Sequence, residues 1–145
     1  MDNLETLVTT VGPANTDSRR IIWEPVNGDM GKFCRLNFFD WTGQEAPGGN
    51  HYHERNEEVF FVTQGEISKM VIENIDTKER HRWKHLGVGT VIHMPVRHAH
   101  ALVLAPGSKM IALCSQPFDE NDKDMPVYML LDKKTGEEIP QAVAA

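Results

Sequence analysis

With 145 residues, 40% of them hydrophobic and 25% charged, the chain has the size and composition of one globular domain and not of a disordered protein. The formal net charge of -6 leaves no broad basic surface for nucleic-acid phosphates, so we expect no nucleic-acid partner. The sequence has no apolar run of about eighteen residues and no signal-peptide pattern at its N-terminus, which predicts a cytoplasmic protein without a membrane partner.

From residue 18 onward, short runs rich in β-branched and aromatic residues alternate with glycine, proline and asparagine. Hardly any segment has a helical period, so the pattern predicts an all-β domain. In chain order we expect strands over residues 20–25, 32–40, 57–63, 67–75, 80–85, 91–94, 99–105 and 109–115. A turn-like Lys-Lys-Thr-Gly sequence predicts a last hairpin between residues 127–132 and 137–139. Strands of this length and spacing are typical of sandwiches and barrels.

The chain divides into an N-terminal arm, a barrel and a C-terminal hairpin with a tail, for which we predict residues 1–17, 18–132 and 133–145. Near the end of the barrel, the sequence FDENDKDMP is rich in acidic residues and predicts a solvated surface loop. The two cysteines, Cys34 and Cys114, lie in apolar alternating segments, where we expect buried free thiols.

The stretch GGNHYHERNEEVFFVTQG, residues 48–65, places two histidines and two acids just ahead of an apolar run. Side chains alternate between the two faces of an extended strand, so His51 and His53 point to the same side. Of the two acids, Glu58 and not Glu57 has the parity of the apolar face of the strand that follows. Two imidazoles and a carboxylate on one wall suit a divalent transition metal such as Fe, Mn, Ni, Co or Zn.

A second group of histidines precedes another apolar strand and offers further ligands. It contains His93, His98 and His100. His98 and His100 lie two residues apart and share a face, so alternation leaves both open as the fourth ligand. A single histidine is more often a surface or hydrogen-bonded residue than a ligand, but two such groups ahead of two apolar strands favour a metal site.

The first histidine stretch resembles the first signature of the cupin superfamily, which consists of small β-barrels of the jelly-roll type. That signature is His-x-His, three or four residues, Glu, six residues and Gly. It is matched by His51, His53, Glu58 and Gly65. The resemblance implies a single-domain jelly-roll barrel and likewise selects Glu58.

The second histidine group resembles the second cupin signature: Gly, five residues, Pro-x-Gly, two residues, His, three residues and Asn. Gly89, Pro95 and His100 match it, and the match selects His100 over His98. The resemblance therefore implies a metal held by His51, His53, Glu58 and His100.

Three positions depart from the cupin signatures. Glu45 stands where a glycine normally precedes the first histidine, Arg97 replaces the second glycine, and Leu104 replaces the asparagine. None of these positions is a metal ligand in the signatures. The family alone does not select a reaction, because one cupin barrel supports dioxygenases, isomerases, epimerases, decarboxylases and simple binders.

Three segments carry a narrower resemblance. GGNHYHERNEEVFFVTQGEI, MVIENIDTKER and MIALCSQPFDENDKD are similar to the cupin domain of capsular-polysaccharide epimerase/reductases and to ketoisomerases of deoxysugar-nucleotide synthesis. This resemblance implies an isomerase or epimerase of a keto-sugar nucleotide. The ligand set equally permits an Fe(II)-dependent dioxygenase of a small organic substrate, and a third alternative is a non-catalytic cupin that binds a small ligand.

Acid–base chemistry on a carbonyl compound needs a base that is not bound to the metal, for which the candidates are His98 and Tyr128. An anionic group of the small-molecule substrate would meet Arg35 and Asn37, which share one face of a predicted strand, or else Arg97. Family grounds and exposed edge strands near the termini also predict a homodimer.

Overall fold

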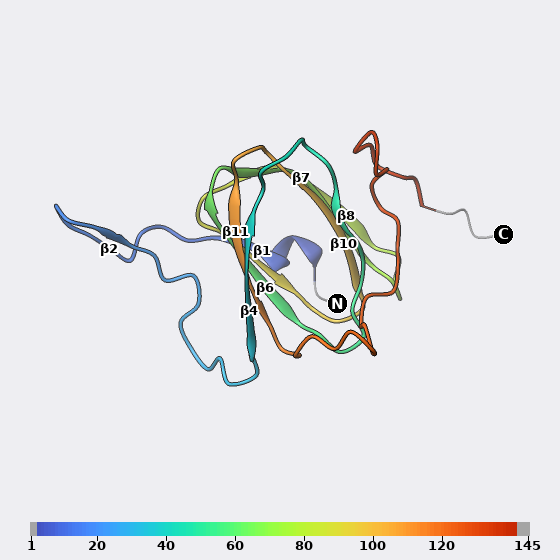
Figure 1. Ribbon diagram of the computed structural model, residues 1–145, viewed down its shortest axis with the longest axis horizontal. Helices are drawn as coiled ribbons and strands as arrows, with labels where there is room; N and C mark the ends of the chain where they lie inside the picture. Colours follow the sequence, from blue (N-terminus) through green and yellow to red (C-terminus); the bar gives the residue numbers. More distant parts are fainter. Residues whose placement is uncertain (1–2, 142–145) are drawn as a thin grey trace.

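Two antiparallel sheets enclose the interior of the protein in the computed structural model, which describes residues 3–141 (Figure 1). One sheet has the strand order β1-β9-β6-β11-β4 and the other β5-β10-β7-β8, while β2 and β3 form a separate pair. The predicted all-β jelly-roll barrel is confirmed.

Its elements are a 3-10 turn η1 (Leu4–Leu7) and the strands β1 (Val8–Thr10), β2 (Asn15–Thr16), β3 (Ile21–Ile22), β4 (Arg35–Asp40), β5 (Gly48–His51), β6 (Glu58–Gln64), β7 (Glu66–Asn74), β8 (Arg80–Gly87), β9 (Thr90–Met94), β10 (His98–Leu104) and β11 (Lys109–Cys114).

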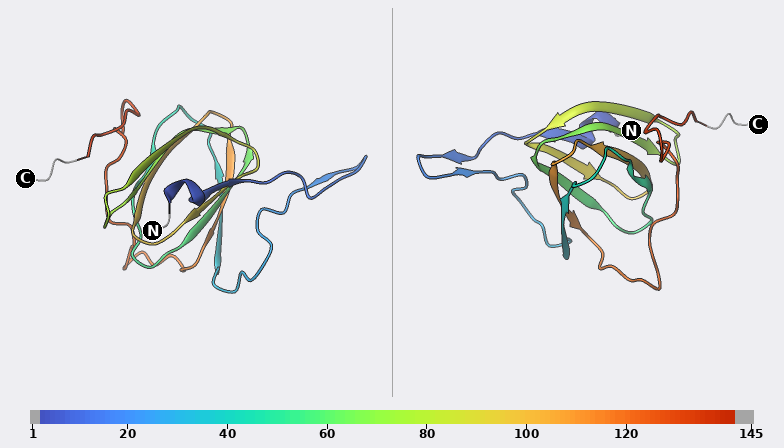
Figure 2. Two further views of the ribbon diagram at one scale, coloured as in Figure 1. Left: turned by 180° about the vertical axis from the view of Figure 1, so that it is seen from behind. Right: turned by 45° about the horizontal axis from the view of Figure 1, so that its top comes forward.

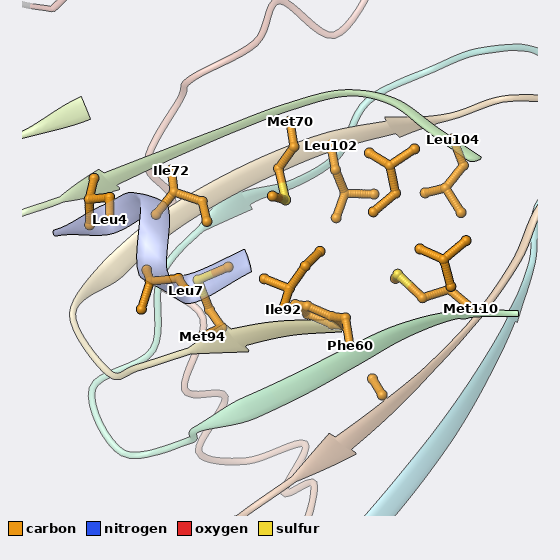
Figure 3. Close-up of a cluster of buried hydrophobic side chains, with 13 residues drawn as sticks. Leu4, Leu7, Phe60, Met70, Ile72, Ile92, Met94, Leu102, Leu104 and Met110 are labelled. Carbon is orange, nitrogen blue, oxygen red and sulfur yellow. The ribbon is translucent and has the colours of Figure 1, made fainter. Parts of the chain in front are cut away.

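Inward-pointing side chains of both sheets form the main core (Figure 3). Strand alternation sends every second residue inward, and the facing sheets bury these side chains against one another. At one end of the interior, Leu4 and Leu7 of η1 lie beside Met94 and fill the space between the sheets (Figure 3). Leu104 and Met110 lie at the opposite end, where they also line the cavity described below.

The four-stranded sheet is apolar on its outer face as well, since β10 is buried throughout from Ala99 to Leu104. Leu130 and Leu131 of the C-terminal segment pack on this face. The buried Asn50 fixes the segment there: its Oδ1 accepts the N–H groups of Leu130 at 2.9 Å and Leu131 at 3.0 Å, and its Nδ2 donates to the Leu131 carbonyl at 2.9 Å. Strand β5, which ends at His51, is therefore held both by β10 and by the C-terminal segment.

The structure adds two strands to the barrel that the residue pattern does not predict. β5 consists of Gly-Gly-Asn-His, which has no β-branched residue, and it is extended because it pairs with β10. β1 pairs with β9 in the five-stranded sheet. In β5, pairing with a long neighbouring strand outweighs a weak local preference, whereas β1 is a short run of three β-branched residues, Val-Thr-Thr, that pairing with β9 extends.

Two predicted strand regions are much shorter in the structure. The range 20–25 is reduced to β3, which pairs only with β2 in a hairpin that projects from the barrel (Figure 2). The predicted hairpin of 127–132 and 137–139 forms only next to its turn: the N–H of Asp132 donates to the Glu137 carbonyl and that of Ile139 to the Leu130 carbonyl, both at 2.8 Å, with one antiparallel bridge between Leu131 and Glu138. The rest of 127–132 is not a strand and has only the bridge His51–Val127. The reason is that the apolar side chains of this segment pack onto the four-stranded sheet.

Both cysteines are free thiols, as predicted, but only Cys114 is buried. Cys34 is exposed because it lies just before the edge strand β4 and joins the sheet through its backbone, with its N–H donating to the Cys114 carbonyl at 2.9 Å. Across residues 3–141, no helix has the length and apolar character needed to span a membrane.

Candidate metal centre

Three histidine side chains meet between the two sheets. His51 ends β5, His53 follows two residues later, and His100 lies in β10 opposite His51. The ring centroids of His51 and His100 are 4.8 Å apart, and that of His53 lies 4.9 Å from His51 and 5.8 Å from His100. One nitrogen of each ring lies within 4.8 Å of the other two. This cluster can hold a metal ion, since imidazole nitrogen is a common ligand of divalent transition metals.

The carboxylate of Glu58 approaches the same cluster from the facing sheet. Its Oε1 lies 3.3 Å from Nε2 of His53, and its Oε2 lies 3.8 Å from Nε2 of His100. Glu58 is the first residue of β6, and Asn56 donates from Nδ2 to its Oε1 at 3.1 Å. The four side chains therefore come from both sheets and offer a mixed nitrogen and oxygen donor set.

Backbone carbonyls orient two of the imidazole rings. Nδ1 of His53 donates to the Asp124 carbonyl, and Nδ1 of His100 donates to the His98 carbonyl at 3.3 Å. Each bond leaves Nε2 with a lone pair directed toward the cluster. Although His53 Nε2 is close to Glu58, the direction does not suit a hydrogen bond, and within residues 3–141 this buried atom has no hydrogen-bond partner. A buried nitrogen without a partner is costly, and a bound cation would satisfy it.

The protonation states in the cluster also suit a cation. Burial lowers the pKa of His51 to about 4, assisted by the neighbouring His100 and His53, and burial lowers the pKa of His100 as well. Both rings are thus neutral near pH 7, as ligands must be. Burial opposes ionisation of Glu58, but His53 and the other imidazoles outweigh it and hold the pKa of this carboxyl below its ordinary value. Burial opposes protonation of His53, but Glu58 and Asp124 outweigh it and raise the pKa of this ring, so metal binding would displace a proton held between His53 and Glu58. The site therefore combines two neutral imidazoles with a third that shares a proton with the carboxylate.

A cavity of about 560 Å³ opens beside the histidine cluster. Volumes of this order hold small organic molecules. One part of the lining is polar and includes the histidine cluster and Glu58. Residues 116–119 and 122–125 form the rim, so the predicted acidic loop is exposed and also borders the site. The apolar wall consists of Phe39, Trp41, Phe60, Leu102, Leu104 and Met110.

Two residues predicted to bind substrate lie in this cavity. Arg35 and Asn37 occupy alternate positions of β4 and point the same way as Phe39. Nε of Arg35 is buried without a hydrogen-bond partner within residues 3–141, and its guanidinium lies 5.9 Å from the Phe118 ring centroid. Nδ2 of Asn37 makes a long contact of 3.9 Å with the Cys114 sulfur. Both side chains have donors available for a ligand.

Neither predicted base lies in the cavity lining. His98 lies in a small hollow lined also by Leu4 and Leu7, and its Nδ1 donates to the Val96 carbonyl at 2.9 Å. Tyr128 lies on the outer face of the four-stranded sheet, where its hydroxyl donates to Glu73. The structure therefore places the side chains of His98 and Tyr128 away from a cavity-bound substrate.

Arg97 also lies outside the cavity. Its guanidinium forms ion pairs with Glu54 at 2.8 Å and with Asp76 at 2.6 Å, on the surface. Its φ of 58° is in the left-handed region, which agrees with the glycine that the cupin signature has at this position. The residue thus has a local structural role, and the structure does not bring it to the site.

Pattern reasoning missed two polar residues that support the cluster. Asn56 donates to Glu58, and Asp124 accepts from the His53 ring through its carbonyl. The spacing of histidines and acids gives no signal for an asparagine. Asp124 lies 70 residues from Glu54, which it contacts, so no local period relates them.

Comparisons with known proteins agree with this fold. A family model described as Cupin matches residues 36–127. Among curated proteins, no match was found. Among solved structures, the TDP-fucose-3,4-ketoisomerase WlaRA of Campylobacter jejuni shares 10% identity with a TM-score of 0.63, over 81% of this chain and 85% of that one. At such identity the likeness concerns the fold.

Two further solved structures are similar. A mutant of the 3,4-ketoisomerase QdtA of Thermoanaerobacterium thermosaccharolyticum, in complex with TDP-4-keto-6-deoxyglucose, shares 14% identity with a TM-score of 0.62, over 80% of this chain and 85% of that one. The capsular polysaccharide assembling protein CapF of Staphylococcus aureus shares 22% identity with a TM-score of 0.52, over 64% of this chain. The match covers 25% of CapF, so this chain corresponds to one part of that protein.

Proposed function

Since this chain belongs to the cupin family, we propose that it is a metal-dependent enzyme that isomerises or epimerises a keto-sugar nucleotide. We propose His51, His53, Glu58 and His100 as the ligands of one divalent transition-metal ion. The observation that carries this proposal is the convergence of three imidazoles and a carboxylate around a buried Nε2 that has no hydrogen-bond partner within residues 3–141. The likeness of fold to sugar-nucleotide ketoisomerases supports the choice of substrate.

The cavity residues would bind and shield such a substrate. A bound divalent ion supplies Lewis-acid chemistry, which polarises a carbonyl and acidifies the neighbouring C–H. Arg35 and Asn37 would hold the phosphate groups, because their unused donors face the cavity. The apolar wall around Trp41 and Leu104 would exclude water from the reacting carbon.

The proton from that carbon must go to a group in the cavity that is outside the ligand set. The carboxylate of Asp124 is already hydrogen-bonded to three backbone N–H groups. We therefore propose that a carboxylate oxygen of Asp119 or Asp122, both at the rim, accepts it.

The apolar wall also favours a second candidate function, an Fe(II)-dependent dioxygenase. Leu102, Leu104 and Met110 would suit an apolar organic substrate better than a sugar, and a donor set of imidazoles and one carboxylate suits Fe(II). The two functions differ in what they consume: an isomerase exchanges a substrate proton with solvent, whereas a dioxygenase consumes O2.

The two activities can be separated in one experiment in deuterium oxide with an oxygen electrode. With TDP-4-keto-6-deoxyglucose as substrate, the proposed enzyme should introduce solvent deuterium into the sugar without O2 uptake. Substrate-dependent O2 uptake with an apolar substrate, and no deuterium in the sugar, would select the dioxygenase. Binding of the sugar nucleotide without either reaction would select a non-catalytic binder.

Replacing Arg35 with glutamine should raise KM for the phosphorylated substrate about 10- to 100-fold and change kcat little, because a hydrogen bond to a charged group contributes roughly 1.5–3 kcal/mol to binding. Arg97→Gln is the matched control, since this surface arginine lies outside the cavity and should leave KM unchanged. An unchanged KM for Arg35→Gln together with a raised KM for Arg97→Gln would show that the substrate binds at the Arg97 surface and not at Arg35. Steady-state kinetics of both variants provide the comparison.

We also propose that two copies associate through the open edge of the five-stranded sheet. β4 is the last strand of this sheet, and its Phe38 and Leu36 side chains are 77% and 49% exposed. Exposed apolar edge strands are covered in most soluble proteins. Light scattering should give twice the chain mass of 16.4 kDa, and Phe38→Asp should lower it to the mass of one chain. A wild-type mass of 16.4 kDa at micromolar concentration would contradict the dimer.

A further inference from the structure

The turn that joins His53 to Glu58 is capped by a residue from the far end of the chain. Oδ1 of Asp124 accepts the N–H of Glu54 at 2.8 Å, and Oδ2 accepts the N–H groups of Arg55 at 2.8 Å and Asn56 at 2.9 Å. A single carboxylate thus satisfies three successive backbone donors. These bonds outweigh the effect of burial and hold the pKa of Asp124 below its ordinary value, so it stays ionised at neutral pH.

The same residue contacts the cluster a second time. Its backbone carbonyl accepts Nδ1–H of His53, so in the neutral ring Nε2 is the nitrogen that is free for a metal, and it is directed toward Glu58. Asn56, whose N–H is capped by Asp124, donates from its side chain to Glu58 Oε1. Asp124 therefore supports one proposed ligand, His53, directly and a second, Glu58, through Asn56.

The turn of residues 54–57 connects the two sheets of the barrel. His53 follows β5 of the four-stranded sheet, whereas Glu58 begins β6 of the five-stranded sheet. The spacing of the two proposed ligands is therefore set by the conformation of residues 54–57 and not by pairing within one sheet. Hydrogen-bond partners behind metal ligands fix ring orientation and distance, and their loss usually weakens metal binding.

We propose that Asp124 is a positioning residue of the metal centre, which fixes the turn between His53 and Glu58 and the orientation of the His53 ring. Asp124 itself contributes no ligand to the metal. The proposal rests on the proposed metal site.

The test compares Co2+ binding by the wild type, Asp124→Asn and Glu120→Gln. Asparagine at position 124 has one acceptor oxygen and directs an NH2 group at backbone donors, so at least one of the three capping bonds is lost. We expect the Co2+ affinity to fall about 10- to 100-fold. The visible absorption spectrum at saturating Co2+ should also change, because the ligand geometry changes. Glu120 lies in the same loop, is exposed and is absent from the cavity lining, so Glu120→Gln should match the wild type.

The outcomes distinguish the proposals from each other. No Co2+ binding by the wild type would overturn the metal site itself. Co2+ binding by Asp124→Asn with the wild-type affinity and spectrum would overturn only the role of Asp124. A loss of apo-protein stability with an unchanged spectrum at saturation would identify a purely structural cap and would also overturn that role.

A measurement on the wild type keeps the proposal testable if Asp124→Asn does not fold. Nitrogen NMR of the apo protein at pH 8 should show His53 with its proton on Nδ1, as the carbonyl of Asp124 requires. A ring with no proton on Nδ1 would show that Asp124 does not orient it.

Discussion

Replacing His53 with alanine should lower the affinity for a divalent transition metal by more than about 100-fold, beyond the loss typical of residues that only support a ligand. The physical reason is that the buried His53 Nε2 lies 3.3 Å from Glu58 Oε1. Without this nitrogen, the metal would lose the imidazole ligand that lies beside the carboxylate of the facing sheet. Isothermal titration with Zn2+ or Co2+ would measure the change.

The control for this variant is His93→Ala. His93 is exposed on β9 and is absent from the cavity lining, so its loss should leave metal affinity within about twofold of the wild type, since surface substitutions rarely perturb a distant site. Equal affinity of His53→Ala and the wild type would remove His53 from the ligand set. Thermal unfolding of both apo proteins would show whether either substitution changes the fold.

Replacing Glu73 with glutamine should reduce the free energy of unfolding by about 3 kcal/mol, because it leaves a buried arginine with fewer partners. Glu73 and Arg80 are almost fully buried side by side, with Arg80 Nε 2.6 Å from Glu73 Oε2. Glu73 also accepts from Tyr128 and from Gln141, the latter at 3.0 Å. Arg80 keeps its second ion pair with Glu138 at 3.1 Å, which places the expected loss at the low end for broken buried pairs.

The contribution of Glu73 should also depend on pH. Burial raises the pKa of this carboxyl, but the hydrogen bonds from Tyr128, Gln141 and Arg80 outweigh it and hold the pKa below its ordinary value of 4.5. A group with a lowered folded-state pKa stabilises the protein fully above the unfolded pKa and loses that contribution as pH falls through the folded one. The difference between wild type and Glu73→Gln should thus be constant near pH 7 and shrink below pH 4.5.

Urea unfolding at several pH values would measure both effects. Glu120→Gln is the control, because Glu120 is exposed in the rim loop and should change stability by less than about 0.5 kcal/mol. A Glu73→Gln protein as stable as the wild type at pH 7 would show that the buried ion pair makes no net contribution to the free energy of unfolding.

The positions of the three histidines follow from the sequence. Alternation predicts that His51 and His53 share a side, and in the structure their rings are adjacent. The cupin resemblance selects His100, which the pairing of β10 with β5 places opposite His51. These positions depend on strand period and motif spacing, both of which are local properties of the chain.

The part that depends on distant packing does not follow from the sequence. His98 shares the parity of His100, but it lies at the end of the interior that Leu4 and Leu7 fill. Parity therefore predicts the face of the strand on which His98 lies, but not its position along the barrel interior. Tyr128 lies outside the barrel because the C-terminal segment packs on the outer face of the four-stranded sheet. The role of Asp124 depends on the same packing.

We expect this barrel to hold one divalent metal ion among His51, His53, Glu58 and His100. Equilibrium dialysis of the chelator-treated wild type against Co2+, followed by metal analysis, tests it most directly. One ion should bind per chain, with a visible spectrum of Co2+ bound to nitrogen and oxygen ligands. The absence of bound Co2+ at millimolar free metal, from a protein that is folded, would contradict it.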